Sequence, residues 1–204
     1  TFSQLGLFDL AAMDPEWILA REDPTEGDLN WIIPERILAL AGPTAETFPL
    51  ANFIQQVALE ENIGAMVRLN EALYDATELR EHGIQHHDLP FADCSTPNVA
   101  IIKRFLRLTS KTLQAERAIA VHCRAGLGRT GTLIACHVIR EYGTTARETI
   151  AWLRMLRPGM ILGHQHLFLE AIQWWLRGET PNAGELAFIK RVLGKEAKSF
   201  YPNN

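Results

Sequence analysis

The sequence predicts an α/β fold with a central, mostly parallel sheet that is flanked by helices. Strand-like apolar runs alternate with helical segments from about residue 31 onward, and such alternation is typical of a parallel sheet. A glycine-containing segment at residues 123–131 joins one of these runs directly to a helix, the position at which such sheets bind ligands. With 204 residues, 47% of them hydrophobic, the chain is long enough for one sizeable core.

Four strands are expected in chain order, because each is a short apolar run bounded by turn residues. The first, at 37–41, reads Ile-Leu-Ala-Leu-Ala and is followed by Gly42 and Pro43. The others are expected at 65–69, 84–89 and 118–121.

Seven helices are expected, at 50–61, 77–81, 97–116, 130–142, 145–156, 165–177 and 183–194. Thr96 is predicted to cap the third, with Pro97 in its first turn, where a missing N–H costs little. Gly143 is predicted to end the fourth. Thr145 and Glu148 have the spacing of a capping box at the start of the fifth.

The chain divides into an acidic extension or linker at 1–30, a main domain at 31–180, and a helical extension at 181–204 that packs on or beside it. Residues 1–30 contain seven acidic side chains and one basic side chain. Within them, 2–13 is predicted to be a short amphipathic helix and 21–28 an acidic linker.

Composition limits the compartment and the partners. The net charge of −4 gives no reason to expect nucleic acid as a partner. No apolar run approaches 18 residues and no signal pattern is present, so a soluble chain without a membrane partner is expected. Three cysteines are too few for a disulfide framework, which favours a reducing compartment, the cytoplasm or the nucleus. A monomer is expected.

The segment at 123–131 has the layout of a phosphate-binding loop. Gly126 and Gly128 allow a tight turn in which successive N–H groups point inward, and the helix that follows adds its positive end. The guanidinium of Arg129 can grip two oxygens. These groups also stabilise a thiolate, so Cys123 is expected to ionise readily and to attack the phosphate. The predicted phosphate-binding residues are Arg124, Ala125, Gly126, Leu127, Gly128 and Arg129.

The run from His122 to Gly131 resembles the His-Cys-x5-Arg-Ser/Thr motif of cysteine-dependent protein tyrosine and dual-specificity phosphatases. More closely, the chain resembles the catalytic domain of the dual-specificity phosphatases of mitotic exit, the cell-division-cycle-fourteen branch. The matching blocks, at 28–34, 67–70, 93–97 and 131–136, lie within residues 28–175. The resemblance implies a protein tyrosine phosphatase-like fold. It also implies hydrolysis of phosphoserine, phosphothreonine and phosphotyrosine in proteins or peptides through a phosphocysteine intermediate.

The same resemblance implies further catalytic roles. Asp93 would be the general acid on a mobile loop, and would then activate water as a base. Gln165 would orient that water, Thr130 would stabilise the departing thiolate of Cys123, and His122 would fix the backbone of the loop. Neither a metal nor a cofactor is required, and His164 and His166, without a third ligand, read as surface residues.

Three alternative functions make different predictions about the sequence. A phosphoinositide phosphatase of the same fold would need extra cations in the loop, where Leu127 stands instead. An RNA 5′-phosphatase would be expected to have a basic surface. A phospho-binding module without catalysis would be expected to have lost Cys123, Asp93 or Arg129, and all three are present. The sequence does not indicate whether phosphoserine or phosphotyrosine is preferred.

The chain departs from the family in two respects. Cys94 stands where relatives usually have glycine, and we consider both a reversible disulfide with oxidised Cys123 and a small buried thiol. Relatives usually carry a preceding non-catalytic domain that helps to read a phosphoserine-proline motif with a downstream basic residue, and the chain is expected to lack it. The acidic stretch at 22–28 could attract such a basic residue or be a solvated linker.

Overall fold

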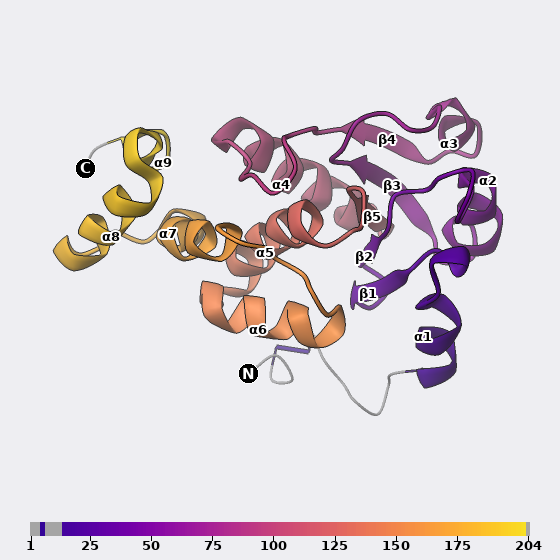
Figure 1. The fold of residues 1–204 in the computed structure, drawn as a ribbon, viewed down its shortest axis with the longest axis horizontal. Coiled ribbons are helices and arrows are strands. Elements are labelled where there is room, and N and C mark those ends of the chain that lie inside the picture. Colours follow the sequence, from indigo (N-terminus) through magenta and orange to yellow (C-terminus); the bar gives the residue numbers. More distant parts are fainter. Residues whose placement is uncertain (1–4, 7–13, 203–204) are drawn as a thin grey trace.

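A computed structural model describes residues 5–6 and 14–202 and contains a five-stranded mixed sheet (Figure 1). The strand order is β1-β2-β5-β3-β4, with β1 antiparallel to β2 and all other neighbours parallel. The strands are β1 (Leu29–Ile33), β2 (Ile37–Leu40), β3 (Ile63–Arg68), β4 (Gln85–Asp88) and β5 (Ala118–His122). The predicted α/β fold with a mostly parallel sheet is confirmed. The antiparallel edge strand β1 was not predicted, because it directly follows the acidic segment.

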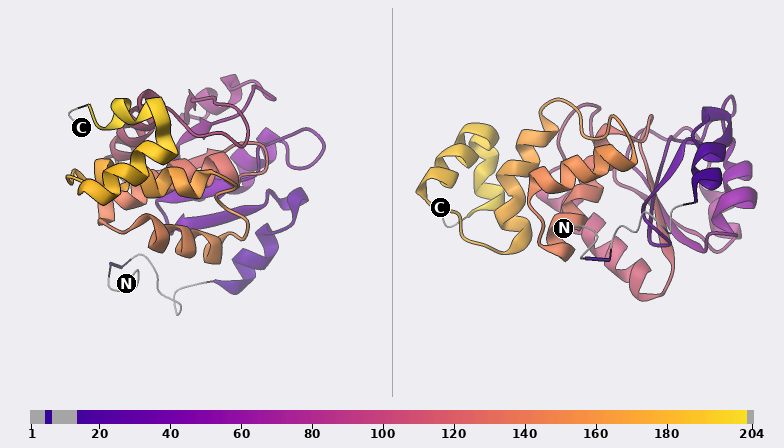
Figure 2. Two further views of the ribbon diagram at one scale, coloured as in Figure 1. Left: turned by 60° about the vertical axis from the view of Figure 1, so that its left-hand side comes forward. Right: turned by 90° about the horizontal axis from the view of Figure 1, so that it is seen from below.

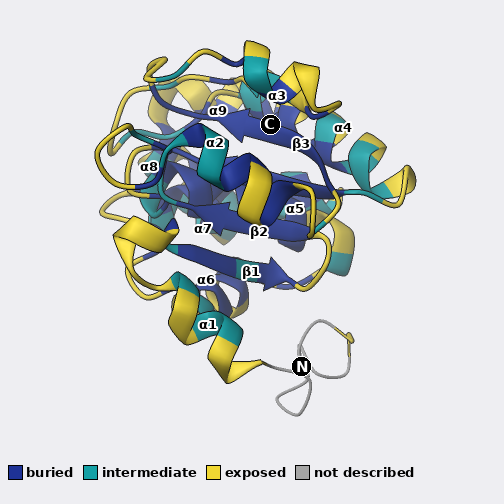
Figure 3. Ribbon diagram, turned by 90° about the vertical axis from the view of Figure 1, so that its right-hand side faces the viewer, coloured by how far each residue is buried: buried dark blue, intermediate teal, exposed yellow. Residues whose placement is uncertain are grey.

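Helices cover both faces of the sheet. One face carries α4 (Val99–Gln114), α5 (Gly128–Tyr142), α6 (Ala146–Leu156) and α7 (Gln165–Arg177). The other carries α1 (Pro15–Arg21), α2 (Leu50–Phe53), the π-helical turn η3 (Ile54–Ala58) and α3 (Thr77–Glu81). Strand side chains alternate between these two cores: Ile119 and Val121 of β5 join the first, whereas Ala118 and Ala120 join the second. The strands are therefore largely buried on both sides (Figure 3).

The C-terminal elements extend the helical layer away from the sheet (Figure 2). They are α8 (Ala183–Leu193), the 3-10 turn η4 (Gly194–Glu196) and α9 (Ala197–Phe200). Phe200 packs edge-on against Phe168 and Trp175 of α7, with ring centroids 5.8 and 5.2 Å away, and the Tyr201 hydroxyl donates to the carbonyl of Ala171 at 2.8 Å. This unit shares one apolar core with α5 and α7.

Several predicted helix ends are confirmed. Gly143 ends α5 with a φ of 67°, and the capping box between Thr145 and Glu148 is formed at the start of α6. The predicted cap at Thr96 is wrong: the side chain of Asn98 accepts from the N–H of Ile101, so Thr96 and Pro97 precede α4. An Asn side chain two residues further on provides the stronger cap.

The N-terminal segment contains helical structure that its acidic composition did not predict. The predicted helix at 2–13 falls on residues of which only 5–6 are described. The helix α1 begins instead after Asp14, which caps it, and the Trp17 indole donates to Glu61 at 3.0 Å. A 3-10 turn, η2 (Pro24–Glu26), lies within the predicted linker. The division of the chain at residues 30 and 180 stays a prediction. No helix in the described part of the chain is long and apolar enough to cross a membrane.

Candidate active site

The predicted phosphate-binding loop connects β5 to α5 at the carboxyl edge of the parallel strands (Figure 1). Cys123 directly follows β5, and α5 begins at Gly128. The loops that follow β3 and β4 leave the sheet at this same edge because these strands run parallel to β5. The topology therefore brings the segment around Asp93 to the loop of Cys123.

Two glycines allow this loop to lie against the end of β2. Gly126 has a φ of 67°, and a Cβ atom there would overlap the carbonyl of Leu40. A Cβ atom on Gly42 would overlap the carbonyl of Cys123, and the Gly42 N–H donates to the carbonyl of Arg124 at 2.8 Å. Only residues without a side chain fit at these positions, which fixes the path of the loop.

The surroundings of Cys123 favour the thiolate. The side chain is buried, which by itself disfavours the charged form. Hydrogen bonds from the hydroxyl and N–H of Thr130 and from the N–H of Leu127, together with the charge of Arg129, outweigh this and lower the pKa of Cys123. The Thr130 hydroxyl has no other partner among the described residues, so it is available to the sulfur.

His122 is fully buried and holds the backbone at Cys123. Its Nδ1 donates to the carbonyl of Cys123 at 2.9 Å, and its Nε2 lies 2.7 Å from the Tyr74 hydroxyl. Burial lowers the pKa of His122 to about 4, so the ring is neutral and Nε2 accepts from Tyr74. The ring of Tyr74 is held in turn by Arg68, whose guanidinium carbon lies 4.5 Å from the ring centroid. Sequence reasoning did not identify Tyr74, which lies 48 residues from His122.

Arg129 is buried at the floor of the site and lies beside Asp93. Its Nη1 donates to the carbonyls of Phe91 at 3.1 Å and Leu69 at 3.3 Å, and its Nε lies 3.1 Å from the Asp93 carboxylate. The side chain of Asp93 is 72% exposed, whereas that of Arg129 is 5% exposed. The structure thus brings the candidate acid and the candidate phosphate-binding cation together.

Gln165 joins the phosphate-binding loop to the loop of Asp93. Its Oε1 accepts from the N–H of Leu162 at 2.8 Å, and its Nε2 donates to the carbonyl of Ser95 at 2.9 Å. A Cβ atom on Gly128 would lie 3.0 Å from that Oε1, so the amide packs directly against the start of α5. Gln165 is therefore at the site, with both ends of its amide already bonded within the protein.

Sequence reasoning missed Arg157, which binds the back of the phosphate-binding loop. Its guanidinium donates to the carbonyls of Ala125 and Gly126, both at 3.0 Å. It also forms an ion pair with Asp28 at 2.7 Å and donates to Asn30 at 2.6 Å. Because these carbonyls point to Arg157, the N–H groups of the loop are free to face the other side. Asp28, the last residue of the acidic stretch at 22–28, pairs with Arg157; whether that stretch attracts a basic substrate residue stays a prediction.

The remaining candidates lie around this centre. Cys94 is exposed and has a φ of 54°, a conformation that favours the glycine expected there from relatives. Its predicted disulfide with Cys123 stays a hypothesis. His164 and His166 flank Gln165, and the described residues contain no cluster of three or more potential metal ligands.

Comparison with protein families and curated proteins gives consistent matches. The family model described as "Tc-R-P: Polymorphic toxin system, DSP-PTPase phosphatase" matches residues 44–143. Human dual specificity protein phosphatase CDC14C is 47% identical over 184 residues, covering 86% of this chain and 39% of that protein. Human CDC14A is 43% identical, with 86% and 31% covered, and the Caenorhabditis elegans tyrosine-protein phosphatase cdc-14 is 39% identical, with 81% and 24% covered. The chain spans about two fifths or less of the length of these relatives.

Solved structures of protein tyrosine phosphatases share the fold. PTPMT1 in complex with PI(5)P matches with a TM-score of 0.63 at 20% identity, covering 71% of this chain and 94% of that one. A protein tyrosine phosphatase from Leishmania major matches with a TM-score of 0.59 at 29% identity, covering 66% and 85%.

Proposed function

The chain belongs to the cysteine-dependent dual-specificity phosphatases and is similar to their CDC14 members, and from this membership we propose that it hydrolyses phosphate monoesters on serine, threonine and tyrosine of proteins. One observation carries the proposal: the sulfur of Cys123 is surrounded by hydrogen-bond donors and by Arg129, which lower its pKa. Groups that stabilise a thiolate at this point also stabilise the phosphoryl oxygens beside it.

In the first step, the thiolate of Cys123 attacks phosphorus while the bond from phosphorus to the substrate oxygen breaks. The electron pair of that bond goes to the leaving oxygen, which takes the proton of Asp93, and a phosphocysteine forms. The inward N–H groups of the loop and the guanidinium of Arg129 hold the three remaining phosphoryl oxygens.

In the second step, water attacks the phosphorus and gives a proton to the Asp93 carboxylate. The bond from phosphorus to sulfur breaks and its electron pair returns to Cys123, where the Thr130 hydroxyl stabilises the thiolate. Gln165 would orient this water through the second lone pair of its Oε1 or the second N–H of its Nε2, because Leu162 and Ser95 each use only one of the two.

Substrate binding changes the partner of Asp93. The carboxylate lies against the Arg129 Nε, a group that the phosphoryl oxygens also require. An arriving phosphate therefore displaces Asp93 from Arg129 and leaves the acid loop able to close toward the leaving oxygen. No metal or cofactor takes part in this sequence.

Protein phosphomonoesters are the proposed substrates, and a phosphoserine followed by proline is the motif that the CDC14 resemblance favours. The names of these relatives support a role in the cell cycle. The free cysteines Cys94, Cys123 and Cys136 support a reducing compartment, the cytoplasm or the nucleus. Phosphoinositides are the weaker candidate, because Leu127 contributes no charge to the loop. A phosphopeptide panel that varies the phosphorylated residue and the next position tests the motif against a soluble phosphoinositide.

Two variants test the chemistry. Cys123→Ser is expected to abolish hydrolysis of an aryl phosphate. Asp93→Asn is expected to lower kcat/KM by about 100-fold or more for a poor leaving group and less for a good one, because a good leaving group needs little protonation. Equal losses for both leaving groups would contradict the assignment of Asp93.

A further inference from the structure

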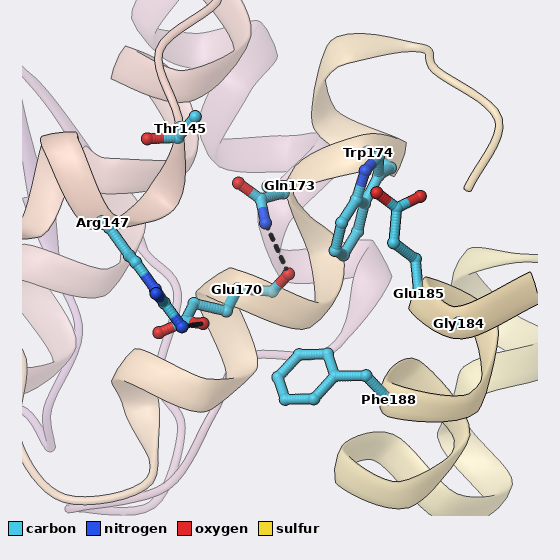
Figure 4. Close-up of a pocket in the computed structure, with 8 residues that line it drawn as sticks. All are labelled: Thr145, Arg147, Glu170, Gln173, Trp174, Gly184, Glu185 and Phe188. Atoms are coloured by element: carbon cyan, nitrogen blue, oxygen red, sulfur yellow. Dashed lines mark hydrogen bonds and ion pairs between the residues drawn. The ribbon is translucent and has the colours of Figure 1, made fainter. Parts of the chain in front are cut away.

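Two cavities lie along the junction of α7 and α8, and Phe188 lines both of them. The first, of about 420 Å³, lies between the middle of α7 and the start of α8 (Figure 4). The second, of about 440 Å³, lies between the start of α7 and the end of α8. The two helices therefore pack with opposite ends together, and a cavity lies at each end of their contact.

The two cavities follow the same side of this helix pair. Their lining side chains recur every three or four positions: Leu167, Glu170 and Trp174 on α7, and Glu185, Phe188 and Val192 on α8. Positions with this spacing lie on one face of a helix. The cavities thus form one surface groove, which we call the α7–α8 groove.

The α7–α8 groove begins beside the candidate active site. Thr96 and His164 line its near end. They are the neighbours in the chain of Ser95 and Gln165, which are joined by a hydrogen bond of 2.9 Å. Since Trp174 follows Gln165 by nine residues, the groove runs for about 14 Å along α7. This is the length of about four residues of extended chain.

The middle of the α7–α8 groove offers apolar contact and no free charge. Trp174 and Phe188 are half-buried, and Figure 4 shows their rings bordering the first cavity. The charged side chains here are paired within the protein: Arg147 lies 3.0 Å from Glu170, and Glu185 accepts from the backbone N–H at the start of α8 at 2.7 Å. A ligand therefore gains most here by burying an apolar side chain.

The near end carries one exposed charge of each sign, Arg191 and Glu196. The guanidinium carbon of Arg191 lies 5.6 Å from the centroid of the Phe188 ring, so the near end adjoins the apolar part. A polyanion would be attracted by the arginine and repelled by the glutamate. A peptide backbone has both acceptors and donors and can pair with the two together. The near end therefore suits a polypeptide.

We propose that the α7–α8 groove binds the substrate polypeptide on one side of its phosphorylated residue and selects an apolar side chain there. That side chain packs on Phe188, between Leu167 and Val192. This docking role rests on the proposed phosphatase activity, because the phosphorylated residue in the catalytic loop is what brings the adjoining chain to the near end. It deepens the proposed function by adding a sequence requirement several residues from the phosphate.

Hydrolysis of a peptide series tests the docking role. Each peptide contains phosphoserine and proline in an alanine-rich sequence, and leucine replaces alanine at one position at a time, up to about six residues to either side. An aryl phosphate, which does not reach the groove, is measured in parallel. Leucine at one or two positions on the same side is expected to raise kcat/KM by about fivefold to tenfold, mainly through KM, as for burial of most of an aliphatic side chain.

Phe188→Ala is expected to remove most of this gain from leucine. Leu186→Ala is the matched control and should retain the gain, because Leu186 is also a half-buried apolar residue of α8 but does not line the groove. Val192→Thr keeps the shape of valine and adds a hydroxyl, and it should lower the gain by about twofold or more.

A series in which leucine raises kcat/KM at no position would overturn the docking role, as would a gain that Phe188→Ala and Val192→Thr both retain. A gain lost equally in Leu186→Ala would contradict it too, because α8 as a whole would then be required and not the groove. In each of these cases hydrolysis of the aryl phosphate still supports the proposed phosphatase activity. Failure of the wild type to hydrolyse either kind of substrate would overturn the proposed function and the docking role with it.

Discussion

The hydroxyl of Thr130 is the uncharged side-chain group that stabilises the thiolate of Cys123 most strongly. Thr130 is fully buried, and its hydroxyl and N–H both stabilise the thiolate. The charge of Arg129 acts in the same direction, but this side chain also binds Phe91, Leu69 and Asp93. Thr130 is therefore the residue at which thiolate stabilisation can be changed with the least effect on other contacts.

Thr130→Val is expected to raise the pKa of Cys123, because the valine has the same shape but no hydroxyl. The pH profile of iodoacetamide alkylation measures this shift, and the wild-type midpoint should lie below the value of about 8.5 for an ordinary thiol. Breakdown of the phosphocysteine should slow by about 10- to 100-fold, as expected for a lost hydrogen bond to a charge. Thr130→Ser retains the hydroxyl and is the control; equal profiles for Val and Ser would contradict this role.

Site residues were predictable where they lie close together in the chain or belong to a recognisable motif. Cys123, Arg129 and Thr130 fall within eight positions, and their spacing alone indicates a phosphate-binding loop. Tyr74 and Arg157 gave no such signal, because their contacts depend on how distant segments pack. The hydrogen bonds between Arg157 and Asp28 join residues 129 positions apart, whereas composition alone places Asp28 in an acidic linker.

At the scale of elements, the phosphate-binding loop is held from behind by β1 and by the end of α6. Arg157 ends α6, and Asp28 and Asn30 orient its guanidinium from the edge strand. The strand β1, which apolar patterning did not predict, therefore helps to hold the phosphate-binding loop through Arg157. The buried strands and the helices with clear caps were predictable because each is specified by its own residues.

Arg157→Lys is expected to loosen the loop, because an ammonium cannot reproduce the planar array of donors. We expect weaker competitive inhibition by phosphate or vanadate, by about tenfold or more, since displaced loop N–H groups bind oxyanions poorly. Stability should fall by a few kcal/mol, as for other damaged buried ion pairs. Arg147→Lys, an exposed pair on the same helix, is the matched control. An Arg157→Lys variant with wild-type inhibition would contradict the role of Arg157 in holding the phosphate-binding loop.

At the scale of the whole molecule, the C-terminal helices α8 and α9 belong to the same apolar core as α5 and α7. Phe200 is 3% exposed, and Phe168 and Trp175 of α7 contact its ring. Figure 2 shows this unit at the end of the helical layer, far from the sheet. Its packing on α7, which begins at Gln165, connects it to the candidate active site through one helix.

Phe200→Ala is expected to lower the free energy of unfolding by about 3–5 kcal/mol, because it removes a buried aromatic ring. Urea denaturation followed by circular dichroism and by tryptophan fluorescence measures this change. The two signals should coincide in a single transition. Leu19→Ala, at a position 70% exposed, should have little effect. Separate transitions would show that residues 181–204 fold as an independent unit.

Acid should destabilise the whole fold. Burial lowers the pKa of both His122 and His137 to about 4, against about 6.5 in an unfolded chain. Between these values the unfolded chain binds more protons than the native protein, so stability is full above pH 6.5 and falls as the pH drops toward 4. Urea denaturation across this range measures the slope, which His137→Gln should reduce by about one proton. A slope unchanged in that variant would contradict the buried neutral ring.

We predict that Cys123 forms a covalent bond to phosphorus during turnover. Acid quenching during hydrolysis of an aryl phosphate, followed by peptide mass spectrometry, measures this most directly. We predict one phosphoryl group on the peptide that contains Cys123, at a higher level in Thr130→Val, where breakdown is slower. Turnover by Cys123→Ser at the wild-type rate, or a phosphoryl group only on another residue, would contradict a phosphocysteine intermediate at Cys123.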